Sequence, residues 1–205
     1  MVFTQPSAEI MFKPIDTKAI LKRLETIGRT CYASLDKMTE TSASDFVRGL
    51  VKRQHEAILE HATITVKFIV DRGISHEIVR HRVASYAQES TRYCNYNKTG
   101  DVKFIIPPLT NMYQITQWEQ ACKASEETYM NLINSGIKAE IARDVLNHSV
   151  ATTLIVTMNL REWRHFFKLR ALGTTGKPHP QMTEVTVPLL KEFQALLPEV
   201  FGDLV

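Results

Sequence analysis

The chain of 205 residues has few cysteines, no long apolar run and little net charge. Three scattered cysteines, Cys31, Cys94 and Cys122, exclude a disulfide framework and predict free thiols in a reducing compartment, the cytoplasm. No window approaches the roughly 20 apolar residues that a membrane helix requires, so we expect no membrane partner. Residues 1–14 lack a basic start followed by an apolar run, and we expect no signal peptide. The net charge of +3 is too small to indicate a nucleic-acid partner.

Several catalytic and nucleotide-binding motifs are also missing from the sequence. It has no G-x-G-x-x-G, no G-x-S-x-G and no C-x-x-C, and Gly176-Lys177 lacks the upstream glycine of a phosphate-binding loop. The pairs His55-Glu56 and His76-Glu77 lack the second histidine that a helical zinc site requires. The sequence therefore predicts neither a Rossmann-type dinucleotide site nor a metal site.

What is present is typical of one globular domain. Apolar residues make up 44% of the chain and charged residues 23%, and no Gly/Ser/Pro-rich linker divides it. We therefore expect a single domain over residues 1–205. Periodicity and capping residues predict helices over 16–29, 44–54, 75–82, 116–135, 138–147, 160–172 and 180–197. Alternation and β-branched residues predict strands over 62–70, 104–106 and 152–158, giving a helix-rich α+β fold with one modest, largely antiparallel sheet.

The most unusual segment is residues 80–93, RHRVASYAQESTRY. It combines three arginines and a histidine with hydroxyl side chains and has a single acidic residue, Glu89. Guanidinium and hydroxyl donors suit the oxygens of a phosphate. A solvated basic loop explains the composition equally well.

This segment resembles the signature of the flavin-dependent thymidylate synthases, R-H-R-x-x-S-x-N-E-x-S-x-R-Y. Seven positions match without a gap, and two depart, with Ala87 in place of Asn and Gln88 in place of Glu. Further elements resemble the family in order: HEAILEH at 55–61, Ala142-Arg143, Asn159-Leu160-Arg161, Leu169-Arg170 and His179-Pro180-Gln181. The similarity spans residues 18–200.

The resemblance implies an enzyme that methylates dUMP to dTMP. It implies bound FAD, NADPH as reductant and methylenetetrahydrofolate as carbon donor. It also implies a helix-rich α/β subunit in a homotetramer that shares its FAD sites between subunits. Members of the family use no cysteine nucleophile, and the sequence agrees because it has no Pro-Cys-Gln segment. Cys94 is therefore interpreted as a bystander.

The resemblance also assigns residues to the two ligands. For dUMP the matching positions are Glu77, Gln88, Ser90, Arg92, Arg143 and the catalytic Arg170. For FAD they are His55, Arg80, His81, Arg82, Gln88, Asn159, Arg161, His165 and His179. A serine hydroxyl beside a guanidinium suits a nucleotide phosphate, and arginines and histidines suit a pyrophosphate outside a Rossmann fold.

Arg170 stands out on a helical wheel of residues 160–172. Arg161, Arg164, His165 and Lys168 share one polar face, and Arg164 is predicted to lie on the surface. Arg170 falls on the opposite side, between Trp163 and Phe166. A snorkelling arginine would explain this position, but the resemblance makes Arg170 the cation that polarises the uracil ring.

Two other functions remain open at this point. A flavoprotein of the same fold could act on another pyrimidine nucleotide. A nucleic-acid-binding domain could use the basic, aromatic helix from Arg161 to Arg170. Flavin absorbance and dTMP formation separate these functions.

Overall fold

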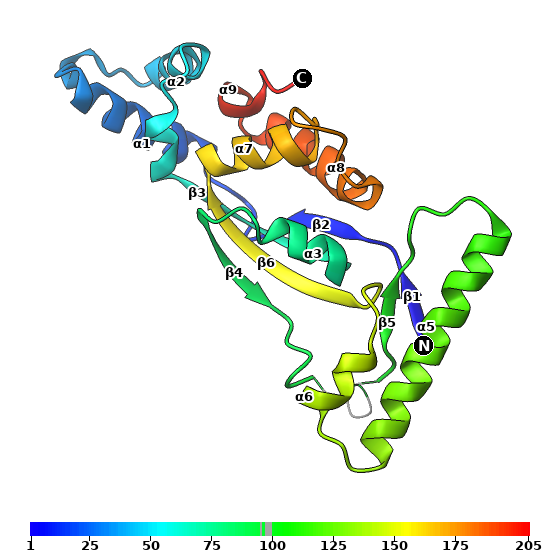
Figure 1. Cartoon of the computed structure of the whole chain (residues 1–205). Helices are drawn as coiled ribbons and strands as arrows, with labels where there is room; N and C mark the ends of the chain where they lie inside the picture. The colour runs from blue at the N-terminus through cyan, green and yellow to red at the C-terminus, as the bar shows by residue number, and fades with distance from the viewer. Residues whose placement is uncertain (95, 97–99) are drawn as a thin grey trace. The chain divides into compact units, whose positions relative to one another are not determined.

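The structure is a computed structural model that describes residues 1–94, 96 and 100–205 (Figure 1). Contacts within the chain define two compact units. The first unit comprises residues 1–8, 67–80 and 86–155, and the second comprises residues 9–66, 81–85 and 156–205. The prediction of one domain over the whole chain stays a prediction.

The helices and strands interleave along the chain. The strands are β1 (Val2–Thr4), β2 (Ser7–Ile10), β3 (Thr63–Asp71), β4 (Ala84–Gln88), β5 (Lys103–Ile105) and β6 (Ala151–Asn159). The α-helices that the described residues give in full are α1 (Thr17–Cys31), α2 (Ser42–Lys52), α3 (Arg72–Ile78), α5 (Met112–Asn134), α6 (Ala139–Ala142), α7 (Leu160–Arg170), α8 (Pro180–Leu196) and α9 (Pro198–Phe201). Short 3-10 helices are η1 (Leu35–Lys37), η2 (Glu56–His61) and η3 (Arg143–Val145).

A four-stranded sheet has the order β2-β3-β6-β4. Its central strands, β3 and β6, run antiparallel in the second unit. Leu160 N donates to Ala62 O, and three residues further along β3 and three residues back along β6 the hydroxyls of Thr65 and Thr157 lie 2.8 Å apart. The helix-rich α+β prediction is confirmed. A second sheet, formed by β1 and β5 in parallel, was not predicted.

Strict alternation of side chains builds the two central strands. In β3 every second side chain from Ile64 to Val70 is buried, and β6 repeats this pattern from Thr152 to Met158. Successive side chains of a strand point to opposite faces, so each strand has one apolar face. The predicted strand at 62–70 is confirmed.

Aromatic packing forms the core of the second unit. Trp163, Phe166 and Phe167 project from α7 and are fully buried. Phe167 and Trp163 contact Phe193 of α8 with ring centroids 5.0 and 5.2 Å away, and the Trp163 indole N–H donates to Ile64 O. Edge and tilted contacts of this kind each stabilise the fold by about 1 kcal/mol, in addition to the stabilisation from the apolar area that they bury. The core therefore fixes the rotation of α7 and with it the direction of its polar side chains.

The first unit has a separate core beneath α5. Cys122 and Tyr129 of this helix are fully buried with Phe104 of β5 and with Val150. The Trp118 indole N–H donates to Ser149 Oγ at 2.9 Å. These contacts hold the segment that leads from α6 into β6.

Several predicted helix starts were wrong because another residue caps the helix. Asp71 Oδ1 accepts from Ile74 N, so α3 begins at Arg72 and ends at Ile78. Asn111 likewise starts α5 at Met112. The helix predicted over 44–54 begins two residues earlier, so Ser44 lies inside α2, where its hydroxyl donates to Glu199. Strand β4, which runs through the arginine-rich segment, was not predicted.

Candidate active site

The predicted site residues divide between the two units. The first unit holds Glu77, Arg80, Gln88, Ser90, Arg92 and Arg143. The second unit holds His55, His81, Arg82, Asn159, Arg161, His165, Arg170 and His179. The nucleotide set thus belongs mainly to the first unit and the flavin set mainly to the second.

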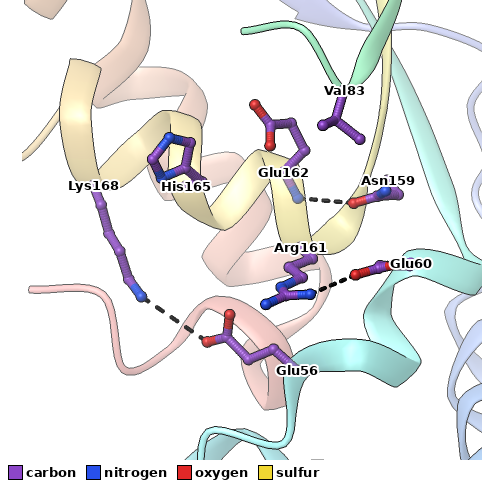
Figure 2. Close-up of a pocket in the computed structure, with 8 residues that line it drawn as sticks. All are labelled: Glu56, Glu60, Val83, Asn159, Arg161, Glu162, His165 and Lys168. Atoms are coloured by element: carbon purple, nitrogen blue, oxygen red, sulfur yellow. Dashed lines mark hydrogen bonds and ion pairs between the residues drawn. The ribbon is translucent and has the colours of Figure 1, made fainter.

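A cavity of about 490 Å³ opens beside α7 in the second unit (Figure 2). Its lining residues are Glu56, Glu60, Val83, Asn159, Arg161, Glu162, His165 and Lys168. Three of them, Asn159, Arg161 and His165, are predicted flavin residues. The volume lies in the range of small-molecule sites.

The junction of β6 and α7 positions these cavity residues. Asn159 ends the strand, and its Oδ1 accepts from Glu162 N at 2.8 Å, which caps α7. Arg161 and His165 follow four residues apart, so they lie on one exposed face of the helix. Arg161 pairs with Glu60, and Lys168 lies 3.9 Å from Glu56. Glu60 is 48% exposed, whereas Glu56 is 16% exposed and also accepts from Arg164.

The donors of this cavity fit an anionic dinucleotide. Arg161 and Lys168 keep 53% and 41% of their side chains exposed, and His165 is exposed. Guanidinium, ammonium and imidazole groups pair with phosphate oxygens and donate to carbonyl groups. Asn159 adds an amide to this set.

His81 is the buried member of the flavin set. Its side chain is 5% exposed, with Nδ1 at 3.2 Å from Glu162 Oε1 and Nε2 at 3.2 Å from Arg170 Nε. Burial, with Arg170 and His165 nearby, lowers the pKa of His81 to about 4. Burial also raises the pKa of Glu162 above its ordinary value. His81 is therefore a neutral imidazole at neutral pH.

His81, Glu162 and His165 together place three possible ligand atoms within 4.8 Å of one another. Histidine and carboxylate are ligand types that zinc accepts. Spacing along the sequence missed this cluster because His81 comes from outside α7. Both ring nitrogens of His81 already lie within hydrogen-bond distance of protein partners.

Arg170 lies half-buried at the end of α7, consistent with its predicted place beside the aromatic face. Its backbone carbonyl accepts from the Thr186 hydroxyl of α8 at 2.8 Å. The predicted surface position of Arg164 was wrong, because its side chain is 2% exposed. Glu56 of η2 and Asp203 of the C-terminal segment cover that face of α7 with acceptors at 2.6–2.9 Å.

The first unit contains an arginine cluster at the turn after β4. Ser90 Oγ accepts from Arg92 N at 3.3 Å, and Arg143 Nη1 donates to Thr91 Oγ1 at 3.3 Å. Arg92 and Arg143 are both exposed, as an anion site requires. Arg92 Nε pairs with Glu140 Oε2 at 3.1 Å. Glu140 was not among the predicted site residues, because nothing in the order of residues indicates that α6 lies beside this turn.

Gln88 has a structural reason to depart from the glutamate of the signature. Its Nε2 donates to Ser75 Oγ at 3.0 Å and to Thr152 Oγ1 at 3.2 Å. The Ser75 hydroxyl proton is already donated to Arg72 O. Ser75 Oγ can therefore only accept, which an amide satisfies and a carboxylate does not. Glu77 is half-buried in α3 of the same unit.

The remaining predicted flavin residues lie at the surface. Arg80, Arg82, His55 and His179 are all exposed. His55 Nδ1 lies 3.0 Å from Tyr32 Oη, and His179 Nδ1 accepts from Gln181 N at the start of α8. His179 thus also caps a helix.

Comparison with solved structures defines the class of fold. The chain superposes on a UMP/dUMP methylase, PolB of Streptomyces cacaoi, bound with 5-Br dUMP, with a TM-score of 0.81. The match covers 98% of this chain and 96% of the other at 22% identity. The shared fold is that of the PolB methylase.

Comparison of sequences gives the family. Residues 15–199 match the family model described as thymidylate synthase complementing protein, and the chain belongs to this family. A flavin-dependent thymidylate synthase of Geobacter sulfurreducens is 35% identical over 184 residues, 86% of this chain and 78% of the relative. The enzyme of that name from Pyrococcus furiosus is 34% identical, and the match covers 77% of this chain and 66% of the relative. The one from Corynebacterium glutamicum is 28% identical, and the match covers 97% of this chain and 84% of the relative. Within the described residues, no helix is long and apolar enough to span a membrane.

Proposed function

We propose that the chain is a flavin-dependent thymidylate synthase. It methylates dUMP to dTMP with FAD as cofactor, methylenetetrahydrofolate as carbon donor and NADPH as reductant. The observation that carries this conclusion is the family match over residues 15–199, together with relatives of that name that align with most of the chain. Bound flavin supplies hydride-transfer chemistry that side chains lack.

In this proposal, the residues that would hold the flavin lie mainly on α7 and at its junction with β6. Asn159, Arg161 and His165 hold it from the cavity, and the family resemblance adds His55, Arg80, His81, Arg82, Gln88 and His179. Because Arg161 is paired with Glu60, whose side chain is 48% exposed, a cofactor phosphate would replace that carboxylate, whereas Glu56 stays paired with the buried Arg164.

The nucleotide phosphate is bound by Ser90, Arg92 and Arg143, with Glu77 and Gln88 contacting the nucleotide. Support comes from the exposed guanidiniums at the turn after β4. Arg170 polarises the uracil, since a fixed cation in a half-buried place stabilises charge that develops on the ring.

No cysteine attacks the uracil in this proposal. Burial and nearby Glu89 raise the pKa of the Cys94 thiol, which disfavours the thiolate that a nucleophile requires. All three cysteines are free, which supports our placement of the enzyme in a reducing compartment, the cytoplasm. The subunits form a homotetramer with shared FAD sites, as the family resemblance implies.

The test has three measurements on the purified chain. Flavin absorbance after FAD addition measures cofactor binding, and dTMP formation with dUMP, methylenetetrahydrofolate and NADPH measures activity. Light scattering measures the mass of the assembly. Bound flavin without dTMP formation, but with methylation of UMP, would instead indicate another pyrimidine nucleotide as substrate. The absence of flavin binding would contradict the proposal.

A further inference from the structure

We infer that Glu162 and His81 form a hydrogen-bonded chain that orients the Arg170 guanidinium, which makes both of them positioning residues. The inference rests on the proposed function only in giving Arg170 its role toward the uracil. All three side chains belong to the second unit. Glu162 and Arg170 come from opposite ends of α7, and His81 lies between their polar groups.

The chemistry of the two partners fixes the protonation of His81. A guanidinium has only N–H donors, so Arg170 Nε requires an unprotonated Nε2 at 3.2 Å. A carboxylate accepts, so Glu162 Oε1 favours a proton on Nδ1 at 3.2 Å. Both conditions are met by one neutral tautomer, with the proton on Nδ1. The lowered pKa of His81 is consistent with this neutral form.

Burial makes the hydrogen-bonded pair of Glu162 and His81 a rigid support for the Arg170 guanidinium. His81 packs edge-on against Phe166 with centroids 4.9 Å apart, and its side chain is 5% exposed. Glu162 is held by the first turn of α7, where Asn159 accepts from its backbone N–H. An arginine side chain has several rotatable bonds, and a hydrogen bond at Nε fixes the plane of its guanidinium. Fixed donors stabilise a transition state better than donors that must reorganise.

A bound transition metal is the competing interpretation of the same residues. A metal on Nδ1 of His81 would move the ring proton to Nε2, where it would face the Arg170 N–H, and a metal on Nε2 would take away the acceptor of that N–H. It would also add a divalent charge beside a guanidinium that already disfavours the cationic form of His81. The geometry therefore points to the hydrogen-bonded chain.

The experiment compares Glu162→Ala with Glu162→Gln in the flavin-loaded enzyme. Without an acceptor for Nδ1–H, Glu162→Ala is expected to lower kcat about 10- to 100-fold while the KM for dUMP changes less than three-fold. Glu162→Gln keeps an acceptor oxygen and is expected to retain kcat within about three-fold. The control is Glu184→Ala, which removes an exposed carboxylate of α8. Thermal melting of all three variants measures any loss of folding.

A second readout does not depend on activity. The nitrogen-15 chemical shifts of His81 in the flavin-free protein are expected to show Nδ1 protonated and Nε2 unprotonated, and this preference is expected to weaken in Glu162→Ala. The same spectra are recorded with Zn²⁺ alone. Loss of the His81 N–H signal at stoichiometric Zn²⁺ would favour the metal site and overturn the inference.

Two further outcomes would overturn it. One is a wild-type kcat in Glu162→Ala, and the other is an equal loss of kcat in Glu162→Gln and Glu162→Ala. Failure of the proposed function looks different. The wild-type protein then forms no dTMP, while the nitrogen-15 shifts still decide whether Glu162, His81 and Arg170 are joined by hydrogen bonds.

Discussion

Arg164 meets Asp203 through two parallel contacts, from Nη1 to Oδ1 at 2.6 Å and from Nη2 to Oδ2 at 2.8 Å. The same guanidinium donates to Glu56 and to the carbonyl of Val200. Hydrogen bonding from Arg164 lowers the pKa of Asp203 below its ordinary value. One buried side chain of α7 thus holds both η2 and the end of the chain.

Arg164→Ala is therefore expected to destabilise the protein by roughly 3 kcal/mol, because it leaves carboxylates without their cation around a buried site. Urea unfolding measures the change in the free energy of unfolding. Arg23→Ala, which removes an exposed arginine of α1, is the matched control and is expected to stay within about 0.5 kcal/mol of wild type. Equal stability of the two variants would contradict this account of Arg164.

The example of Arg164 explains what the sequence could predict and what it could not. Strand β3 and helices α1, α5, α7 and α8 were predicted within a few residues, because their patterns are local. A helical wheel gives the face of a residue but not what covers that face. Glu56 and Asp203 lie 108 and 39 residues away from Arg164, and no local pattern connects them.

The candidate site shows the same division. The arginine-rich segment and the resemblance supplied the site residues, whereas their partners had to come from the structure. Glu162 and Glu140 were missed because a glutamate on a helix is ordinary in a sequence. The structure shows their significance, because Glu162 lies within hydrogen-bond distance of His81 and Glu140 within hydrogen-bond distance of Arg92.

Stability should depend on pH through His81. Its pKa is about 4 in the folded state against 6.5 when unfolded, so the unfolded chain binds more protons between these values. The stability contribution is fully present above pH 6.5 and is lost as pH falls toward 4. At pH 5 the loss is roughly 2 kcal/mol. Urea unfolding of wild type and His81→Gln at pH 7 and pH 5 measures it, and an equal pH dependence in both would refute the assignment.

Glu140→Gln is expected to lower the KM for dUMP. Glu140 pairs with Arg92 at 3.1 Å, and both side chains are partly exposed, so a substrate phosphate must compete with a carboxylate. Removing one exposed ion pair corresponds to about a two- to five-fold change. The control is Glu127→Gln, which removes an exposed carboxylate 3.9 Å from Lys123. Steady-state kinetics at low and high salt measure the effect, which added salt should reduce. An unchanged or higher KM in Glu140→Gln would mean that Arg92 does not bind the phosphate.

Cys94→Ser is expected to keep dTMP formation within about three-fold of wild type. Burial and Glu89 raise the pKa of this thiol, so little thiolate forms at neutral pH. The test is dTMP formation by the flavin-loaded variant, with Cys31→Ser as the exposed-cysteine control. Complete loss of activity in a folded, flavin-containing Cys94→Ser enzyme would contradict this prediction and indicate that Cys94 acts as a nucleophile.

Arg170→Ala is expected to abolish dTMP formation while the protein stays folded and binds flavin. Arg170 lies half-buried with Nε held by His81, so its charge acts on the uracil from a fixed place. Loss of one such donor lowers kcat about 100- to 1,000-fold, roughly 3–4 kcal/mol of transition-state stabilisation.

Assays at saturating and at low dUMP separate this role from simple binding. The control is Arg23→Ala, since Arg164 is buried and cannot serve as a neutral site. If Arg170 only covers the aromatic face of α7, the activity of Arg170→Ala falls only in proportion to its loss of stability relative to Arg23→Ala. A higher dUMP requirement with full turnover would make Arg170 a uniform binder of the nucleotide, because an interaction equal in ground and transition states changes KM alone. A fall in kcat at saturating dUMP is the result that identifies a group acting in the transition state.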